Sequence, residues 1–337
     1  MKLLDEKIRK IKNGIELGVD EIEAVFGDIF FNDHDDVLIH DFLVALFQKG
    51  ESLDEIFGAA KFLKKNGRSV ECRSVDLLDC CGTGGDGKGT FNISTAVAFV
   101  LAGGGVKVAK HGNRAVSSKS GSADVLEKLG IRINLTAEQS ADCVDETGIG
   151  FFFAPTHYPF LRKVAPIRQG IPHRTIFNLL GPLINPAGAT RQLLGVADPR
   201  FVPIHCEVLR RLGSSSAVVV SSEDGLDEFT LTAKSRLARL HNGKITEAIF
   251  DPWKETGYPP CDLSALAGGT AEENALRLKK CLKGHSQPLD HVVHINAAWG
   301  FVVAGLAGSF MDGLILAQES ISSGKAYGKL SQGVLRS

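Results

Sequence analysis

Apolar residues in the first part of the chain recur at helical spacing. Between positions 39 and 47 they fall at 39, 42, 43, 46 and 47, which is the stripe of a helix with one buried face. Gly50 is a natural end for that helix, and Ser52-Leu-Asp-Glu55 has the form of a capping box that opens a further helix. Because no strand pattern occurs before Val75, we predict a small helical domain over residues 1–70.

Short apolar runs alternate with helical stretches from residue 75 onward. Strands are predicted at 75–81, 106–109, 150–154, 193–197, 217–220 and 291–295, with a helix beginning near Ser94. Two apolar runs around His241-Asn-Gly-Lys244 predict a hairpin over 236–250. Strands that alternate with helices are typical of a parallel sheet. The predicted fold class is therefore α/β, with a larger domain over 71–337, a mostly parallel central sheet and a domain boundary near 67–74.

Composition and charge are those of an ordinary globular protein. The 337 residues are 44% hydrophobic and 23% charged, and 38 basic residues against 39 acidic ones give a net charge of -1. Such a chain has no overall field to attract nucleic acid or an anionic membrane, so we expect neither as a partner. Its apolar stretches are shorter than the roughly 20 residues of a membrane span, and its charged first residues do not resemble a signal peptide. Seven cysteines without a CxxC pair predict a reduced, cytoplasmic protein with neither structural zinc nor a disulfide.

A glycine-rich segment, Gly82-Thr-Gly-Gly-Asp-Gly87, lies between a predicted strand and a predicted helix. Glycines allow backbone N–H groups to approach an anion, and a helix N-terminus adds partial positive charge, although a tight turn without a ligand explains the segment equally well. A dinucleotide site expects an acidic residue about 20 positions later, where the chain has Lys110-His-Gly-Asn-Arg114. A Walker A loop expects Ser or Thr after Lys88, where the chain has Gly89. Both interpretations therefore lack a required residue: the acidic residue that would bind the ribose in the first, and the hydroxyl residue that would bind magnesium in the second.

A phosphoribosyl pyrophosphate site is the third interpretation of the glycine segment. Asn92 and Ser94 stand at the expected helix start, where they could cap the helix or hydrogen-bond a pyrophosphate or a hydrated metal ion. The following strand brings a run of basic residues, with no acidic residue between 107 and 119; they are Lys107, Lys110, Arg114 and Lys119. Segment 117–122 adds serine hydroxyls. The pattern suits a ligand with several phosphates, and solvated lysines are the alternative.

Two later segments supply the remaining candidate chemistry. A second basic cluster consists of Arg162, Lys163, Arg168 and Arg174, again without an acidic residue between 162 and 174. A guanidinium can bond both oxygens of a carboxylate, so one member facing a carboxylate substrate is the functional interpretation, and surface or ion-paired arginine is the alternative. Asp224-Gly-Leu-Asp-Glu228 follows the apolar strand at 217–220 and offers the oxygen ligands that magnesium prefers, or a solvated acidic loop.

In this order, the segments resemble the anthranilate phosphoribosyltransferase family. The matching motifs are Gly82-Thr-Gly-Gly-Asp86, Asn92-Ile-Ser-Thr95, Lys110-His-Gly-Asn-Arg114, Ser117-Ser118, Ser120-Gly-Ser-Ala-Asp124, Arg174-Thr-Ile-Phe-Asn-Leu-Leu-Gly-Pro-Leu183 and Gly225-Leu-Asp-Glu228, with further similarity at 48–51, 317–321 and 323–325. The similarity covers nearly the whole chain. It implies a fold like that of nucleoside phosphorylases and phosphoribosyltransferases, a homodimer formed through the helical domain, and transfer of phosphoribosyl from 5-phosphoribosyl 1-pyrophosphate to anthranilate in tryptophan biosynthesis.

The resemblance also implies roles for individual residues. Contacts to phosphoribosyl pyrophosphate would come from Gly82, Gly85, Asp86, Thr90, Asn92, Ile93, Ser94, Thr95, Lys110, His111, Gly112, Asn113, Arg114, Ser117, Ser118 and Ser122. Anthranilate would contact Gly82, Asn113 and Arg168. Two Mg2+ ions per subunit would be held by Ser94, Asp227 and Glu228. Lys110 and Arg168 would be the catalytic residues, the first stabilising charge on pyrophosphate and the second aiming the amine.

The chain departs from the family pattern near the acceptor. The usual R-x-E-L-G-x-R-T reads Arg168-Gln-Gly-Ile-Pro-His-Arg174-Thr175, and Tyr158 stands where the family has histidine. Pro172 biases the residue before it toward an extended conformation, which could turn Arg168 away and leave Arg174 as the rival carboxylate partner. Trp299 stands where a small residue is common, which we expect to concern packing.

Two other functions remain alternatives at this level. A nucleoside phosphorylase of related architecture would carry K-H-S-T-G-G around the glycine loop, whereas Leu78-Asp-Cys-Cys81 precedes the loop here. A nucleic-acid-binding relative would keep the basic groove and lose the metal ligands. Asp227, Glu228 and the near-neutral net charge disfavour the latter.

Overall fold

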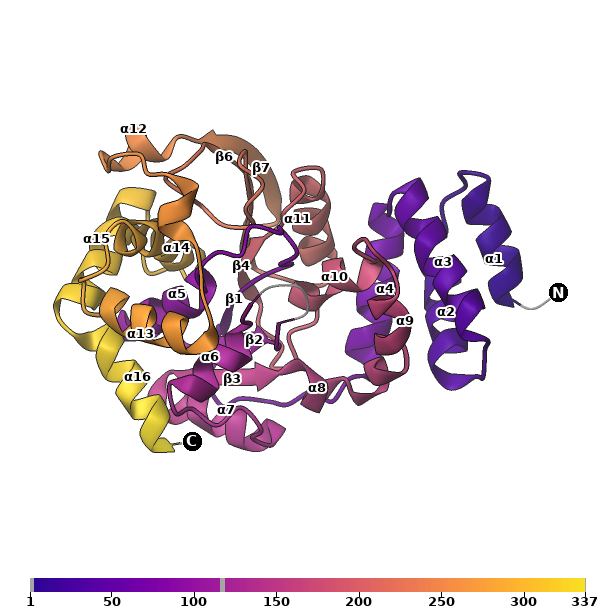
Figure 1. Cartoon of the computed structure of the whole chain (residues 1–337), viewed down its shortest axis with the longest axis horizontal. Helices are drawn as coiled ribbons and strands as arrows, with labels where there is room; N and C mark the ends of the chain where they lie inside the picture. Colours follow the sequence, from indigo (N-terminus) through magenta and orange to yellow (C-terminus); the bar gives the residue numbers. More distant parts are fainter. Residues whose placement is uncertain (1–2, 116–118, 337) are drawn as a thin grey trace.

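The computed structural model describes residues 3–115 and 119–336. Its first four helices are α1 (Leu3–Lys12), α2 (Val19–Phe31), α3 (Asp36–Lys49) and α4 (Leu53–Asn66), and they form a bundle at one end of the molecule (Figure 1). The predicted capping box is present at the start of α4, where the Ser52 amide donates to Glu55 Oε2 at 2.8 Å. The helical pattern of the sequence is thus confirmed in this part of the chain.

A seven-stranded sheet forms the centre of the rest, in the order β3-β2-β1-β4-β5-β6-β7. Its strands are β1 (Leu78–Gly82), β2 (Val108–Gly112), β3 (Ile149–Phe153), β4 (Arg191–Gly195), β5 (Ser216–Ser222), β6 (Ser235–His241) and β7 (Lys244–Phe250). Strands β1 to β5 pair in parallel, while β6 and β7 add an antiparallel hairpin at one edge. The mostly parallel sheet and the hairpin around Asn242 are as predicted.

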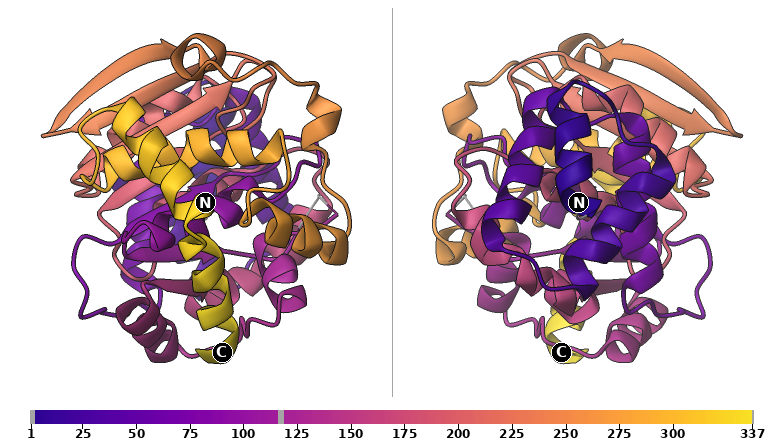
Figure 2. Two further views of the ribbon diagram at one scale, coloured as in Figure 1. Left: turned by 90° about the vertical axis from the view of Figure 1, so that its left-hand side faces the viewer. Right: turned by 90° about the vertical axis from the view of Figure 1, so that its right-hand side faces the viewer.

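Helices cover both faces of the sheet and both ends of the molecule. They are α5 (Ile93–Gly103), α6 (Ser122–Lys128), α7 (Ala137–Thr147), α8 (Ala154–His157), α9 (Ala165–Gln169), α10 (Ile176–Leu180), α11 (Phe201–Arg211), α12 (Pro252–Thr256), α13 (Ala271–Cys281), α14 (Leu289–Val303), α15 (Phe310–Ser322) and α16 (Lys325–Arg336), with 3-10 turns η1 (Pro159–Lys163), η2 (Gly181–Leu183) and η3 (Leu263–Leu266). Helices α15 and α16 close the end opposite to the N-terminal bundle (Figure 2). None of the described helices is long and apolar enough to cross a bilayer.

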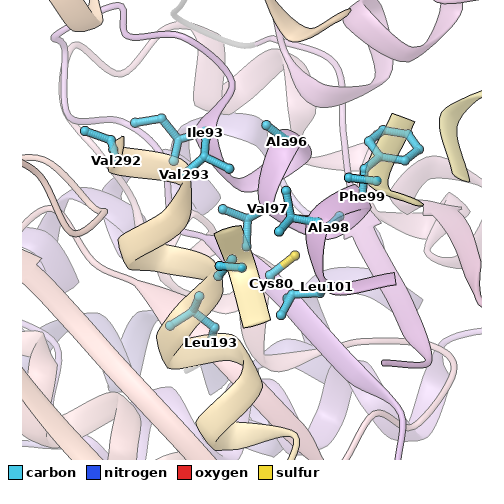
Figure 3. Close-up of a cluster of buried hydrophobic side chains, with 14 of the residues drawn as sticks. Cys80, Ile93, Ala96, Val97, Ala98, Phe99, Leu101, Leu193, Val292 and Val293 are labelled. Carbon is cyan, nitrogen blue, oxygen red and sulfur yellow. The ribbon is translucent and has the colours of Figure 1, made fainter. Parts of the chain in front are cut away.

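Alternate residues of the central strands belong to two separate hydrophobic cores, one on each face of the sheet. Val218 and Val220 join α5, α14 and their neighbours on one face, whereas Ala217 and Val219 join α11 and the N-terminal helices on the other, because successive side chains of a strand point to opposite faces. In the first core, Cys80 of β1 lies against α5 and α14 (Figure 3). The second core packs the bundle and helices α9 and α10 against the sheet.

The predicted strand at 291–295 is wrong, because these residues lie within helix α14. Nearly every residue of α14 is buried, so the helix is enclosed on all sides and lacks a helical stripe in its sequence. A short apolar run cannot by itself distinguish a buried strand from a segment of a buried helix. The other strands occur with shifted ends, and the extension of β2 to Gly112 places Lys110 and His111 inside a strand.

Candidate active site

The candidate residues gather at the carboxyl ends of the parallel strands. The glycine segment follows β1, residues 113–115 follow β2, and the acidic segment 223–228 follows β5. In open α/β sheets this edge, near a reversal of strand order, is where ligands bind. Here β1 leads outward to β2 and β3 on one side, and β4 leads outward to β5 on the other, so the reversal lies between the adjacent strands β1 and β4.

Left-handed backbone conformations shape the loop between β1 and α5. Gly84 and Gly85 have φ values of 61° and 75°, which residues with a side chain rarely adopt. The Asp86 carboxylate folds back within the loop and accepts the Lys88 amide at 3.0 Å. The glycines therefore allow the backbone of this loop to bend, as expected for a loop whose backbone approaches an anion closely.

Two carboxylates from the segment after β5 contact the glycine loop and the start of α5. Asp227 Oδ2 accepts the Gly84 amide at 2.8 Å, and Glu228 Oε1 accepts the Ser94 amide at 3.2 Å. A Cβ atom on Gly82 would overlap the Asp227 carboxylate, so the glycine makes the approach possible. The structure thus brings Ser94, Asp227 and Glu228 together, as the family resemblance implied.

Burial makes these two carboxylates reluctant to ionise. It raises the pKa of Asp227 to about 6, with repulsion from Asp86 as the second cause. It also raises the pKa of Glu228 well above its ordinary value, and here the neighbouring Asp227 adds to the effect. A nearby cation would lower both pKa values and favour the ionised carboxylates.

Lys110 supplies one cation at this position. The residue is only 3% exposed, and its ammonium donates to the Cys80 carbonyl at 2.7 Å and to Ser94 Oγ at 3.3 Å. Burial lowers the pKa of Lys110, but the acidic groups around it outweigh burial and raise the pKa above its ordinary value; the Cys80 and Cys81 thiols contribute most, followed by the Asp79 and Glu228 carboxylates. The lysine is thus a fixed positive charge beneath the glycine loop and is not a solvated side chain.

A divalent cation fits the chemistry of this donor set. The described residues contain no group of three or more His, Cys, Asp or Glu side chains arranged as a metal site. Magnesium, however, is usually held by one or two carboxylates together with water and substrate phosphates. Asp227, Glu228 and the Ser94 hydroxyl match that incomplete set, and a cation beside the two buried carboxylates would favour their ionised forms.

The other described residues assigned to the phosphate ligand lie in α5, β2, the start of α6 and the loops that follow β1 and β2. Asn92 precedes α5 without capping it, and its side chain instead joins Ser120 and Asn274, with Asn274 Nδ2 donating to Asn92 Oδ1 at 2.9 Å. Ser122 Oγ donates to the Asn113 carbonyl at 3.2 Å. No sequence signal pointed to Asn274. Ile93, Thr95, His111 and Gly112 continue α5 and β2, and Gly85, Asp86 and Thr90 lie in the loop; Ser117 and Ser118 are outside the described residues.

The basic run around Lys110 does not act as one positive surface. Arg114 forms ion pairs with Asp124 at 2.9 Å and Glu127 at 2.6 Å, acids that follow it in the chain and lie beyond the stretch free of acidic residues. Lys107 donates to the Asp145 carbonyl at 3.1 Å, away from the glycine loop. The interpretation of Lys107 and Arg114 as free phosphate-facing charges is therefore not supported by their side-chain contacts. Of Lys107, Lys110 and Arg114, only Lys110 places its charged group beside the glycine loop.

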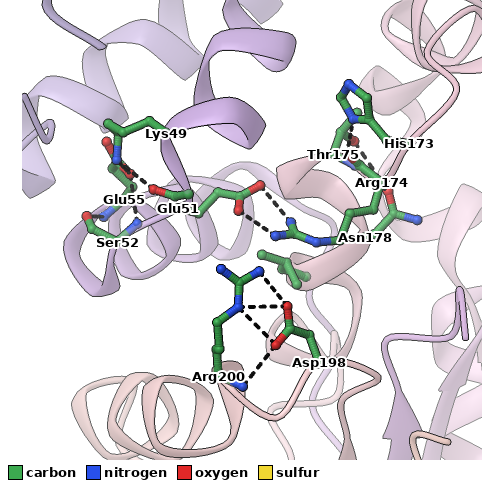
Figure 4. Close-up of polar contacts among 12 residues, drawn as sticks. Lys49, Glu51, Ser52, Glu55, His173, Arg174, Thr175, Asn178, Asp198 and Arg200 are labelled. Carbon is green, nitrogen blue, oxygen red and sulfur yellow. Dashed lines mark hydrogen bonds and ion pairs between the residues drawn. The ribbon is translucent and has the colours of Figure 1, made fainter. Parts of the chain in front are cut away.

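The second basic cluster separates into arginines with different partners. Arg174 forms a two-pronged ion pair with Glu51 at 2.8 and 2.9 Å, and the Glu51 side chain is fully buried (Figure 4). Arg168 has no carboxylate partner among the described residues, lies 5.2 Å from the centre of the Phe177 ring and donates to Asn178 Oδ1 at 3.5 Å. Burial lowers the pKa of Arg168, as expected for a cation without a counter-ion. Of these two arginines, Arg168 is thus the one whose guanidinium has no carboxylate partner among the described residues.

The departures from the family pattern have local structural roles. Tyr158 is buried, and its hydroxyl donates to the Ile184 carbonyl, with its ring 6.1 Å from that of His111. Ile171, before the proline, is also buried. Trp299 stacks on Phe229 with ring centres 5.7 Å apart, so its role is packing, as expected.

Comparison with known proteins matches both parts of the chain to one family. A model described as the glycosyl transferase family α/β domain matches residues 74–327, and its companion, the helical bundle domain of the same family, matches residues 6–67. The anthranilate phosphoribosyltransferase of Desulfatibacillum aliphaticivorans is 45% identical over 97% of each chain.

Solved structures show the same similarity in three dimensions. The anthranilate phosphoribosyltransferase of Thermus thermophilus has a TM-score of 0.90 and 40% identity, covering 98% of each chain. The Saccharomyces cerevisiae enzyme in complex with PRPP and Mg has a TM-score of 0.88 and 27% identity, covering 99% of this chain and 97% of that one. With 4-fluoroanthranilate bound, the yeast enzyme has a TM-score of 0.82 and 26% identity, covering 94% of this chain and 91% of its own.

Proposed function

Because the chain belongs to the glycosyl transferase family and to its anthranilate phosphoribosyltransferases, we propose that phosphoribosyl transfer takes place between the glycine loop and Arg168. The protein transfers the phosphoribosyl group of 5-phosphoribosyl 1-pyrophosphate to anthranilate, giving N-(5-phosphoribosyl)anthranilate and pyrophosphate, a step of tryptophan biosynthesis. The observation that carries the assignment is the convergence of Lys110, Asp227 and Glu228 on the loop after β1.

In this reaction the anthranilate amine displaces pyrophosphate at the anomeric carbon of the ribose. The bond to the leaving oxygen breaks as the sugar gains oxocarbenium character, so the barrier depends mainly on charge that develops on pyrophosphate. The buried Lys110 ammonium and the N–H groups of the glycine loop stabilise that charge from fixed positions. The aromatic amine is neutral at pH 7 and needs no strong base to attack.

Arg168 orients the acceptor. Its guanidinium lacks a carboxylate partner among the described residues, so it is available to the anthranilate carboxylate. Holding an amine in line with the carbon it attacks contributes several kcal/mol to catalysis. Gly82 and Asn113 complete the acceptor contacts in this proposal. The remaining phosphate-ligand residues keep the roles that the family resemblance implies, except Arg114, whose guanidinium is paired with Asp124 and Glu127.

Magnesium completes the phosphate site in this proposal. Asp227, Glu228 and Ser94 would hold it, and when bound it adds positive charge at the pyrophosphate oxygens. We propose two ions per subunit, the number that the family resemblance implies. Activity should vanish in excess chelator and return with magnesium in a titration. Full turnover in chelator would remove the metal from the proposal.

We further propose a homodimer that forms through the helical domain, residues 1–70. The exposed apolar side chains Ile15, Phe31 and Val37 support this, since all three lie on the N-terminal bundle. Sedimentation of the purified protein should give twice the chain mass, and a monomer at micromolar concentration would contradict the proposal. A cytoplasmic location is proposed on the free state of the cysteines in the described chain.

A steady-state assay tests the function directly. Purified protein with magnesium and phosphoribosyl pyrophosphate should consume anthranilate and release pyrophosphate in equal amounts. Incubation of the protein with inorganic phosphate and a nucleoside, the substrates of a phosphorylase, should release no free nucleobase. Turnover of the second pair in place of the first would overturn the proposed function.

A further inference from the structure

One amide side chain links the free arginine of the acceptor site to the backbone that carries it. Asn178 Oδ1 accepts the Thr175 amide at 3.0 Å and the Thr175 hydroxyl at 3.4 Å, which forms the capping box of α10. The same oxygen accepts Arg168 Nη2 at 3.5 Å. Because all of these partners donate, only the oxygen of the amide can face them.

The contact with Asn178 is the only side-chain hydrogen bond of Arg168 among the described residues, and the Phe177 ring lies beside the guanidinium at 5.2 Å. An arginine side chain has many rotamers, so an unanchored one loses substantial entropy when it binds a ligand. The neutral acceptor Asn178 fixes the guanidinium without neutralising it. The charge therefore remains available to a carboxylate.

The segment that carries Asn178 is itself tied to the N-terminal bundle. Arg174 precedes the cap residue Thr175 and forms its two-pronged ion pair with the buried Glu51, between α3 and α4 (Figure 4). The Arg174 guanidinium also lies 5.2 Å from the Phe47 ring centre. The backbone at Thr175 thus has a defined place relative to the helical bundle.

We propose that Asn178 is a positioning residue for the acceptor, holding Arg168 in the orientation that receives a carboxylate. The inference rests on the proposed function, because it specifies how that site selects an aromatic amine with a neighbouring carboxylate. It assigns to Asn178 a role beyond capping a helix of five residues.

Two substitutions separate positioning from capping. Asn178→Leu removes the oxygen and so loses both roles. Asn178→Asp keeps an oxygen for the Thr175 amide and should cap at least as well, since acidic side chains suit the first turn of a helix. Its new carboxylate, however, pairs with Arg168 and competes with the substrate. We expect both variants to raise KM for anthranilate by about 10-fold or more, as for a lost charged contact, with kcat and KM for phosphoribosyl pyrophosphate within about twofold of wild type.

A remote capping box provides the matched control. Gln139 caps α7 in the same way, with its side-chain oxygen accepting the Thr136 amide at 3.0 Å. Gln139→Leu should lower the urea midpoint of unfolding and leave both KM values unchanged. Asn178→Asp should show the opposite, with an unchanged midpoint and a raised KM for anthranilate.

The outcomes distinguish this inference from the function on which it rests. Wild-type turnover of anthranilate with an unchanged KM in Asn178→Asp would show that Asn178 is only a cap, and the inference would be wrong while the function stands. Equal rises of KM for both substrates would show a general distortion of the site and would also contradict positioning. Absence of anthranilate turnover in the wild type would overturn the function and the inference together.

Discussion

Replacing each of the two arginines near the acceptor, Arg168 and Arg174, with alanine should produce opposite effects on catalysis and stability. Arg168 has no carboxylate partner in the described part of the chain, whereas Arg174 is paired with the fully buried Glu51. The Arg168 guanidinium is therefore available to a substrate carboxylate, whereas the charge of Arg174 is neutralised within the fold by Glu51.

The magnitudes follow from these contacts. A charge-assisted hydrogen bond to the anthranilate carboxylate contributes about 1.5–3 kcal/mol, so Arg168→Ala should raise KM for anthranilate roughly 10- to 150-fold. Its effect on stability should be below about 1 kcal/mol, since no partner is left unpaired. Arg174→Ala leaves the Glu51 carboxylate buried and unpaired, which costs about 3–5 kcal/mol of the free energy of unfolding.

The assay combines steady-state kinetics, followed by the loss of anthranilate fluorescence, with urea unfolding followed by circular dichroism. Arg162→Ala is the matched control, because Arg162 is an exposed arginine in the same segment and should change neither measurement. If Arg174→Ala selectively raises KM for anthranilate with an unchanged urea midpoint, and Arg168→Ala does not, the assignment of the acceptor residue is wrong.

Three further perturbations test other parts of the structure. Lys110→Ala should weaken use of phosphoribosyl pyrophosphate by about 2–4 kcal/mol in kcat/KM, the range for one charge-stabilising donor, and an unchanged value would show that the ammonium plays no part. Gly82→Ala should abolish activity because its Cβ would overlap the Asp227 carboxylate, whereas Gly328→Ala, which has open space around its Cβ, should remain active; an active Gly82→Ala would contradict the packing described. Burial lowers the pKa of His294 to about 4, below its unfolded value, so its contribution to stability is present above about pH 6.5 and lost as pH falls toward 4. Between pH 7 and pH 5 the wild type should lose about 2 kcal/mol more unfolding free energy than His294→Gln, and equal losses in urea titrations would exclude this residue as the cause.

Local patterns determined the elements whose signals are confined to a few neighbouring residues. The capping box at Ser52, the hairpin at Asn242 and the glycine loop after β1 were predicted because turn and cap chemistry depends on residues close in sequence. The segment at 291–295 was misassigned for the same reason. A helix buried on every side has no local pattern to distinguish it from a strand, and only its packing against α5 and α15 shows what it is.

The candidate site was predicted as a set of motifs, and the fold decided which members work together. Asp227 reaches Gly84 across 143 positions of sequence, so no local pattern contains that hydrogen bond. The sequence showed a basic run around Lys110, but the acids that neutralise Arg114 lie outside that run, on α6. Charge counted along the chain differs from charge in space, because opposite charges from other elements are visible only after folding.

The choice between Arg168 and Arg174 shows the same division. Their spacing and the proline between them left the carboxylate partner open in the sequence. The tertiary structure places Glu51, 123 positions away, against Arg174 and leaves Arg168 beside a neutral amide. The sequence by itself determined that two arginines stand near an acceptor site. Only the packing of the N-terminal bundle against segment 154–180 decided which one keeps its charge free, because an ion pair between distant segments exists only where the fold brings them together.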